Sequence, residues 1–287
     1  MRPAAYHLLR PERRETSVVF ASPHSARDYP ADFLARSVLN AREVRSSEDA
    51  YVDELFSCAV DHGAPILLGG VPRAYLDLNR GPEELDPALI QGVRRSGHNP
   101  RVASGLGVIP RVVANGRSIY RGKIGLDEAQ DRIDRYWRPY HDQLQTLLDE
   151  AQRDFGEAVL VDCHSMPREA LENVGPRASA RPDVVLGDRF GAAAASSVVD
   201  RIEAAFSRAG LKVARNMPFA GAYICQHYGR PSRRQHVVQV EIDRSLYMNE
   251  ANVQPRADFA AFRAVLDSVV AEIAAIGRRT ELPMAAE

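Results

Sequence analysis

Residues 159–167 read VLVDCHSMP, a short apolar and β-branched run that ends in ionisable residues before a proline. A strand that is apolar on both faces belongs in a sheet whose two faces are both covered. Similar runs, which we also predict to be strands, lie at residues 17–21, 65–69, 74–78, 107–112, 184–186, 211–214 and 237–242. This stretch and its relatives therefore predict a covered sheet.

Helical periodicity separates several of these runs. Between residues 127 and 155 the apolar side chains recur at helical spacing, with charges on the opposite face. Pro139 lies inside that pattern, where a proline can kink a helix. Further helices are predicted at 47–62, 190–209 and 256–276. The alternation of strands and helices predicts a three-layer α/β fold with a mixed, mostly parallel sheet.

The chain has 287 residues, enough for roughly two domains of about 150 residues or one large α/β domain. It shows no internal repeat and no clear linker, so we expect a single domain over residues 1–287. The segment 81–105 is rich in Gly, Pro and Arg and is predicted to be a long surface loop, of the kind that often borders a functional site.

Composition argues against several classes of protein. There are 37 Lys and Arg residues against 38 Asp and Glu residues, and no basic run, so we expect no nucleic-acid partner. No apolar stretch approaches the ~20 residues of a membrane span, and no secretory signal is evident, so we expect no membrane partner and a cytoplasmic location. The three cysteines form no CxxC pair, which excludes a thiolate zinc knot. Phosphate-binding glycine loops and a GxSxG elbow are absent too.

Two strands deliver a histidine at their carboxyl ends, where open α/β sheets bind ligands. Residues 18–25 read VVFASPHS and present His24, and residues 159–167 present His164. Two such histidines can hold one metal ion, with Asp162 or a backbone carbonyl fixing a tautomer. A third, carboxylate ligand is available from Asp49 or Glu48, although acidic residues there also suit the start of a helix.

Two further segments carry candidate functional residues. Glu241 lies among Val238, Val240 and Ile242, and a buried carboxylate whose pKa is raised by desolvation suits a general base. The alternative is a glutamate on the polar face of an edge strand.

Asn79 and Arg80 follow another apolar run, and an arginine at such a point can clamp a substrate carboxylate through paired hydrogen bonds. In the alternative interpretation, Asp77 forms a structural ion pair with Arg73 or Arg80.

Several short motifs occur in order from about residue 17 to 250, over most of the chain. They are SPHS at 22–25 with Tyr29-Pro30, residues 49–55, PRAYLDLNR at 72–80, DCHSM at 162–166, LGDR at 186–189, NMPFAG at 216–221, QVEI at 239–242 and RSLY at 244–247. In these motifs the chain resembles the N-formylglutamate amidohydrolase family.

The resemblance implies a phosphorylase/hydrolase-like α/β fold, similar to zinc carboxypeptidases and aspartoacylases. It implies a Zn²⁺-dependent amidase that cleaves the acyl group from an acidic amino acid such as N-formylglutamate, a reaction of histidine breakdown. His24 and His164 resemble zinc ligands, with Asp49 or Glu48 as the third. Glu241 resembles the carboxylate that activates water, and Asn79 and Arg80 resemble the pair that holds a substrate carboxylate, with Arg73 as a further candidate.

Other functions remain open from the sequence. The same scaffold is compatible with a metallo-carboxypeptidase or another N-acyl amino acid or peptide amidase. A protein that binds carboxylates without turnover is the alternative from a different class. The expected partner in each enzymatic case is a small N-acyl molecule, and the oligomeric state is not predicted.

Overall fold

The computed structural model describes residues 3–94, 99–172 and 181–279. A seven-stranded sheet forms in the order β1-β3-β2-β4-β7-β5-β6. Neighbouring strands from β3 to β7 run parallel, as do β5 and β6, whereas β1 and β5 lie antiparallel to β3 and β7. The strands are β1 (Tyr6–Leu9), β2 (Val18–Ser22), β3 (Ile66–Gly69), β4 (Ala158–Met166), β5 (Val184–Gly187), β6 (Val213–Arg215) and β7 (Gln235–Asp243), with a separate ribbon of β8 (Met248–Asn249) and β9 (Gln254–Pro255).

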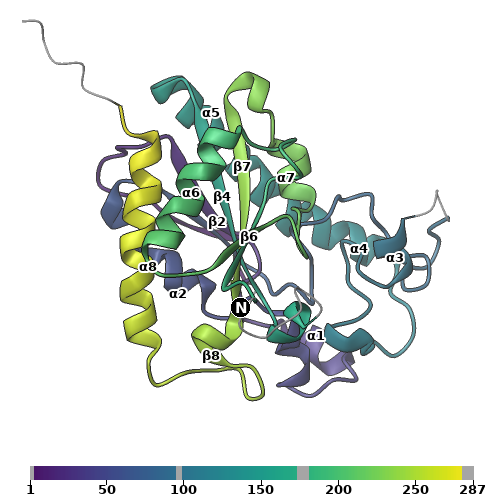
Figure 1. Cartoon of the computed structure of the whole chain (residues 1–287). Helices are drawn as coiled ribbons and strands as arrows, with labels where there is room; N and C mark the ends of the chain where they lie inside the picture. The colour runs from purple at the N-terminus through teal and green to yellow at the C-terminus, as the bar shows by residue number, and fades with distance from the viewer. Residues whose placement is uncertain (1–2, 95–98, 173–180, 280–287) are drawn as a thin grey trace, which may run out of the picture.

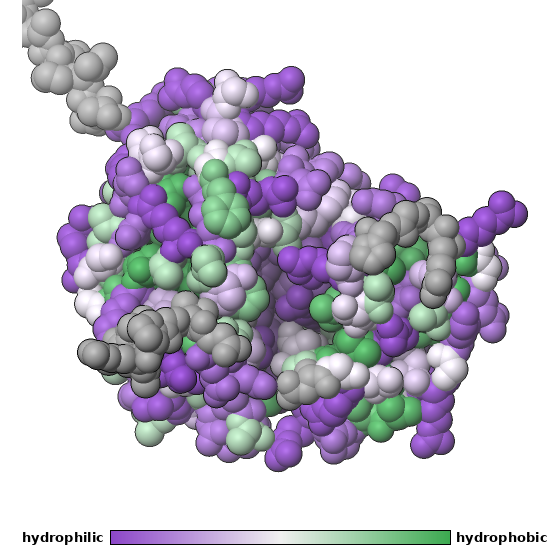
Figure 2. All heavy atoms as spheres, turned by 45° about the vertical axis from the view of Figure 1, so that its right-hand side comes forward, coloured by the Kyte–Doolittle hydropathy of each residue, from purple (hydrophilic) through white to green (hydrophobic). Residues whose placement is uncertain are grey.

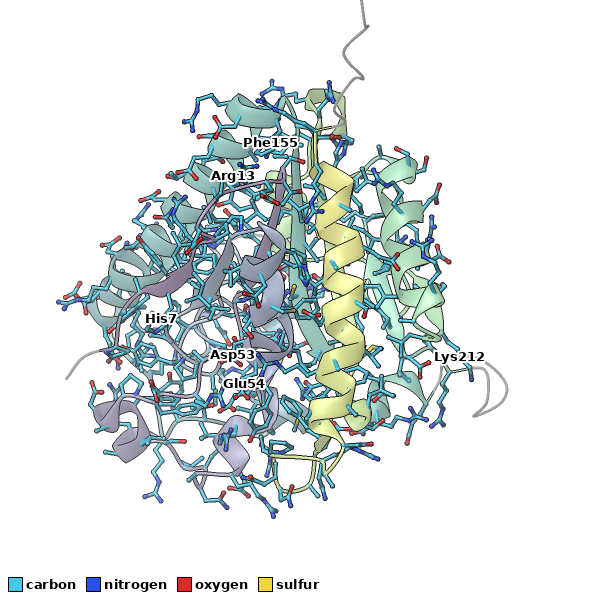
Figure 3. All side chains as sticks on the ribbon, turned by 90° about the vertical axis from the view of Figure 1, so that its left-hand side faces the viewer. His7, Arg13, Asp53, Glu54, Phe155 and Lys212 are labelled. Atoms are coloured by element: carbon cyan, nitrogen blue, oxygen red, sulfur yellow. The ribbon has the colours of Figure 1, made fainter. Side chains whose placement is uncertain are left out.

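Helices cover both faces of this sheet (Figure 1). Within β2, Val18 and Phe20 pack into the cluster shared with α2, α6 and α8, whereas Val19 and Ala21 pack into the cluster shared with α5. Figure 3 looks onto the face that α8 covers. The helices are α1 (Ala31–Arg36), α2 (Val52–Phe56), α3 (Pro100–Ala103), α4 (Leu126–Arg132), α5 (Arg138–Phe155), α6 (Ser196–Arg208), α7 (Tyr223–Tyr228) and α8 (Phe259–Ala274). The predicted three-layer α/β fold with a mixed, mostly parallel sheet is confirmed.

Two predicted strands are wrong. Residues 74–78 form turns after Pro72, whose carbonyl accepts the N–H groups of Tyr75 and Leu76. Residues 107–112 form a loop that meets them through one backbone hydrogen bond, from Asp77 N–H to the Val108 carbonyl. Their apolar side chains are buried beneath the α5 face rather than in a strand, and a short apolar run does not distinguish these two environments. The edge strand β1 has no counterpart among the predicted strands.

The predicted helix boundaries also change. The segment 47–62 breaks into a 3₁₀ turn at Glu43–Ser47, then α2, then a second 3₁₀ turn at Ser57–His62, because Glu48 is extended and Tyr51 is left-handed with φ of 66°. Residues 126–155 stay helical, with a π-helical turn at Ile133–Trp137 that ends two residues before Pro139 in α5. The helix predicted at 190–209 begins only at Ser196.

The long loop, the cysteines and the lengths of the helices can also be compared with the predictions. The loop 81–105 is irregular apart from the single turn of α3, and residues 95–98 lie outside the described part. All three cysteines are buried and free of disulfides. The described helices include none with the length and apolar character needed to cross a membrane.

Candidate active site

The carboxyl ends of three parallel strands bring the candidate residues together. The central strands β2, β4 and β7 are neighbours in the sheet. His24 lies two residues beyond the end of β2, and His164 lies near the end of β4. Glu241 on β7 is the direct Cα partner of His164, and parallel neighbours in register point their side chains to the same face. Sequence positions 24, 164 and 241 therefore meet at one edge of the sheet.

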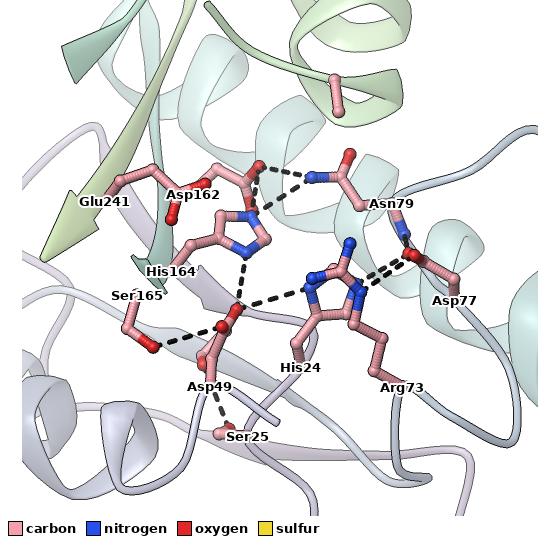
Figure 4. Close-up of polar contacts among 12 residues, drawn as sticks. His24, Ser25, Asp49, Arg73, Asp77, Asn79, Asp162, His164, Ser165 and Glu241 are labelled. Carbon is pink, nitrogen blue, oxygen red and sulfur yellow. Dashed lines mark hydrogen bonds and ion pairs between the residues drawn. The ribbon is translucent and has the colours of Figure 1, made fainter. Parts of the chain in front are cut away.

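Both histidines point a ring nitrogen at one carboxylate oxygen (Figure 4). Asp49 Oδ2 lies 2.9 Å from His164 Nδ1 and 3.4 Å from His24 Nδ1. One ligand atom from each of these three residues lies within 4.8 Å of the others, and all three residues are buried. This is the spacing of a group that can share one metal ion.

The opposite nitrogen of each ring is held by another carboxylate. His24 Nε2 lies 2.8 Å from Asp77 Oδ1, and His164 Nε2 lies 3.0 Å from Asp162 Oδ2. When these carboxylates accept the Nε2 proton, each Nδ1 keeps its lone pair for a metal, as in the carboxylate–histidine–metal arrangement. The role predicted for Asp162 agrees with this geometry. Asp77 pairs with Arg73 at 3.0 Å as the alternative interpretation held, but it also orients His24.

The structure separates Asp49 from Glu48. Asp49 Oδ1 accepts hydrogen bonds from Arg244 Nη2 at 3.0 Å and from Ser165 Oγ at 3.2 Å, which leaves Oδ2 facing the histidines. Glu48 turns away, and its carboxylate accepts from Tyr29 and Arg45. The third position in the cluster therefore belongs to Asp49.

The donor atoms fit a metal cation. His24 Nδ1 is buried, and no hydrogen-bond partner reaches it from the described ranges, which for a buried polar atom costs about 1–3 kcal/mol. Two neutral imidazoles and one carboxylate form a common ligand set for catalytic zinc. An ion shared by these three residues would give the unpartnered nitrogen a ligand role.

The electrostatics of the cluster favour a cation. Burial raises the pKa of Asp49, but the hydrogen bond from His164, the nearby His24 ring and the charge of Arg244 lower this pKa well below its usual range. Burial lowers the pKa of His164, yet the charge of Asp162 and the hydrogen bonds that the ring donates to Asp162 and Asp49 raise this pKa well above its usual range. The carboxylates here stay ionised and stabilise positive charge at this point.

Glu241 is buried beside the cluster of His24, Asp49 and His164. Its side chain is 7% exposed, and β7 is flanked by β4 and β5, so the alternative of an edge strand is wrong. Gln239 Nε2 donates to Glu241 Oε1 at 2.8 Å. Burial, aided by the negative charge of Asp49, raises the pKa of Glu241 to about 7, although the positive charge of His164 opposes this. A carboxyl with that pKa can accept and release a proton near neutral pH.

The Asn79–Arg80 segment is anchored from behind by helical residues. Trp137 Nε1 donates to the Arg80 carbonyl, and His141 Nε2 lies 2.9 Å from the Leu78 carbonyl. Arg80 is 3% exposed and donates from Nε and Nη1 to the carbonyls of Leu106 and Asn79. Asn79 Nδ2 lies 3.2 Å from His164 Nε2 and 3.4 Å from Asp162 Oδ2.

One cavity of about 260 Å³ contains most of these residues. Its wall includes both histidines, Glu241, the predicted substrate-binding residues Arg73, Asn79 and Arg80, and Arg244. Figure 2 shows a hollow near the centre of one face of the molecule, with hydrophilic and hydrophobic residues around it. The cavity has the size and charge for a small anionic molecule.

A family model described as N-formylglutamate amidohydrolase matches residues 16–248. The chain belongs to the N-formylglutamate amidohydrolase family. An N-formylglutamate deformylase of Pseudomonas aeruginosa is 30% identical over 274 residues, which cover 93% of this chain and 96% of the relative. An N-formylglutamate deformylase of Pseudomonas putida is 30% identical over 213 residues, 72% of this chain and 74% of that protein.

A solved structure of an N-formylglutamate amidohydrolase from Ralstonia eutropha JMP134 aligns with a TM-score of 0.89. The two sequences are 34% identical, and the alignment covers 96% of this chain and 99% of the other. This likeness extends the family assignment to the full three-layer architecture.

Sequence reasoning missed several residues of this amidohydrolase site. Gln239 precedes Glu241 by two positions on one strand, so the alternation of side chains placed it on the same face. Arg244 follows the same strand and reaches Asp49 across 195 positions, and Asp77 reaches His24 across 53. No local pattern carries those two contacts. Asp53 and Glu54, which follow Asp49 in the sequence and are labelled in Figure 3, pair with Arg27 and lie outside the cluster of His24, Asp49 and His164.

Proposed function

We propose that this protein is a zinc-dependent amidohydrolase that removes the formyl group from N-formylglutamate and releases formate and glutamate. The observation that carries the proposal is the convergence of His24, Asp49 and His164 in one buried cluster, whose two histidines line a small cavity together with Glu241. The Pseudomonas relatives, whose names state a deformylase activity, support the choice of substrate. The match over residues 16–248 supports a single amidohydrolase domain.

His24, Asp49 and His164 would hold the zinc ion. A zinc ion in such a site polarises a carbonyl oxygen and acidifies water. Asp77 and Asp162 keep the two histidine rings oriented, and Arg244 and Ser165 keep the Asp49 carboxylate turned toward them. These contacts preorganise the ligand atoms before any ion or substrate enters.

Glu241 acts as the general base and then as the general acid. Its Oε1 atom is held by Gln239, so Oε2 takes a proton from the attacking water and passes it to the amide nitrogen as the C–N bond breaks. One water is consumed, the formyl carbon leaves as formic acid, and the nitrogen becomes the amine of glutamate. A pKa near 7 suits both transfers.

Arg80 holds the α-carboxylate of the substrate, with Asn79 and Arg73 beside it in the cavity wall. Its Nε and Nη1 atoms are fixed by two backbone carbonyls, so the guanidinium is already ordered when the substrate arrives. A preordered charged group loses less entropy on binding, and correct positioning of the formyl group can supply several kcal/mol of barrier reduction.

The first test measures zinc content and formate release together. Wild-type protein should hold about one zinc at this site and release formate from N-formylglutamate, and His24→Ala and His164→Ala should lose both properties. His7→Ala, which removes an exposed histidine on β1, is the matched control and should keep both. Circular dichroism verifies folding of each variant. Stoichiometric zinc without formate release would redirect the search to other N-acyl amino acids or small peptides. All proteins in this test carry Cys58→Ser, because a second cluster at Cys58 can also hold an ion, and folded histidine variants that keep their zinc in that background would refute the site.

Glu241→Gln tests the assigned base. The variant keeps an oxygen that can accept from Gln239, so we expect a normal fold and normal zinc content. Loss of the proton-accepting group should lower kcat by about 10²- to 10⁴-fold. A turnover number near that of wild type would show that another group moves the proton.

The setting of this reaction also belongs to the proposal. Three buried cysteines without a disulfide are typical of a reducing compartment such as the cytoplasm. Release of glutamate from its formyl derivative suits a step of histidine breakdown, as the family resemblance implies.

A further inference from the structure

The catalytic cavity opens into a larger one. The second cavity has a volume of about 890 Å³ and carries Arg189, Tyr223 and Arg230 in its wall. Arg80, Arg101, Gly221 and Ala222 line both cavities. Arg101 therefore lies with Arg80 at the junction of the two cavities.

A chain of hydrogen bonds ties Arg101 to the substrate-binding segment. Asn99 Oδ1 caps the single turn of α3 by accepting the N–H groups of Arg101 and Val102 at 3.0 and 3.3 Å. Asn99 Nδ2 donates to Glu84 Oε2 at 3.0 Å, and Glu84 Oε1 accepts the N–H of Gly81 at 2.8 Å. Because Gly81 directly follows Arg80, these bonds fix the backbone of Arg101 relative to the proposed α-carboxylate site.

Arg101 forms no ion pair among the described residues, unlike two other arginines of the smaller cavity, although Glu83 and Glu84 line the larger cavity with it. Arg73 is paired with Asp77, and Arg244 is paired with Asp49. The Arg101 guanidinium has no hydrogen-bond or ion-pair partner within the described residues 3–94, 99–172 and 181–279. Burial is the main cause that lowers the pKa of Arg80, and the positive charges of Arg73 and Arg101 lower it further. The guanidinium groups of Arg80 and Arg101 therefore share one electrostatic environment. The junction is therefore suited to a second anionic group.

We propose that Arg101 binds the side-chain carboxylate of the substrate and thereby selects N-acyl derivatives of acidic amino acids over neutral ones. The inference rests on the proposed amidohydrolase function and adds to it the residue that reads the side chain. Arg80 takes the carboxylate common to all N-acyl amino acids, whereas Arg101 takes the one that distinguishes glutamate from glutamine. A site built to bind a charged group discriminates strongly against an analogue that lacks it.

The test compares N-formyl-L-glutamate with N-formyl-L-glutamine, which has nearly the same shape and no side-chain charge. Arg101→Leu should lower kcat/KM for N-formylglutamate by about 10- to 100-fold, the effect of one lost hydrogen bond to a charged group. The same variant should change kcat/KM for N-formylglutamine by less than about threefold, and Arg101→Lys should restore part of the preference.

Arg189→Leu is the matched control, because Arg189 lines only the second cavity. It should leave the preference for glutamate within about threefold of wild type. Equal losses on both substrates in Arg101→Leu would overturn the proposal, and so would a loss of preference in Arg189→Leu alone.

Calorimetric titration with L-glutamate and L-glutamine separates this inference from the proposed function. If wild-type protein fails to hydrolyse N-formylglutamate, the proposed function fails. Arg101 is then still supported if the wild type binds glutamate more tightly than glutamine and Arg101→Leu abolishes that difference. Equal binding of the two amino acids by wild-type protein would overturn the role of Arg101.

Discussion

His141→Gln should make the fold less sensitive to mild acid. His141 lies on α5 and is buried, with Nε2 2.9 Å from the Leu78 carbonyl and Nδ1 2.9 Å from the Tyr228 hydroxyl. The carbonyl accepts the Nε2 proton, so the neutral ring satisfies both contacts. Burial lowers the pKa of His141 from 6.5 to about 3, although the hydrogen bond to Leu78 opposes the shift.

The direction and size of the effect follow from this pKa. Between pH 6.5 and 3 the unfolded chain protonates this histidine and the folded chain does not, so stability present above pH 6.5 is lost as the pH falls. At pH 5, roughly 1.5 pH units below the ordinary value, the loss is about 2 kcal/mol at about 1.36 kcal/mol per unit. The loss of about 2 kcal/mol is the same for any folded-state pKa below about 4, because the His141 ring of the folded protein then stays neutral at pH 5.

Urea unfolding of wild type and His141→Gln at pH 8 and pH 5, followed by circular dichroism, measures this contribution. A chelator is included throughout, because metal binding is itself pH dependent. The variant should be less stable at pH 8, since a buried ring is lost. Its deficit should shrink by about 2 kcal/mol at pH 5, since every other titrating group is common to both proteins. A deficit that stays constant between the two pH values would refute the assignment of a buried neutral histidine.

Three more predictions concern the site. Asp77→Asn should weaken zinc binding by about 10- to 100-fold, as measured by competition with a chelator. Both proteins carry Cys58→Ser, because a second cluster at Cys58 can also hold an ion. Gly69→Ala should lower both zinc content and activity, because a Cβ there would lie 2.4 Å from the carbonyl oxygen of Pro23, the residue before the proposed zinc ligand His24. Unchanged metal content and activity would contradict that steric argument. Gln239→Leu should reduce kcat by about tenfold, in line with the loss of a hydrogen bond of about 1.5 kcal/mol to a charged group. KM should change little, because the variant frees the Glu241 carboxyl without touching the proposed α-carboxylate site; a change in KM alone would show that Gln239 contacts substrate.

The strand-borne part of the site was predictable from the sequence. His164 and Glu241 lie inside apolar strands, and His24 lies two residues beyond another strand. The alternation of side chains and the meeting of parallel strand ends are local properties of a covered sheet. The predicted strands at 74–78 and 107–112 are wrong. Their apolar side chains are buried without strand partners, because burial alone does not dictate backbone pairing.

The sequence by itself determined the α/β class, the residues at the strand ends and the family, because strand patterning and short motifs are encoded by neighbouring residues. Only the tertiary structure decided between Asp49 and Glu48, which are adjacent and chemically alike. The Asp49 N–H donates to the His24 carbonyl at 3.0 Å and Arg244 fixes its carboxylate, while Tyr29 and Arg45 hold Glu48 away. The same is true of Asp77 beside His24 and of Arg101 at the junction of the cavities. These contacts join loops that are distant in sequence, and their partners are set by how those loops pack across the sheet edge.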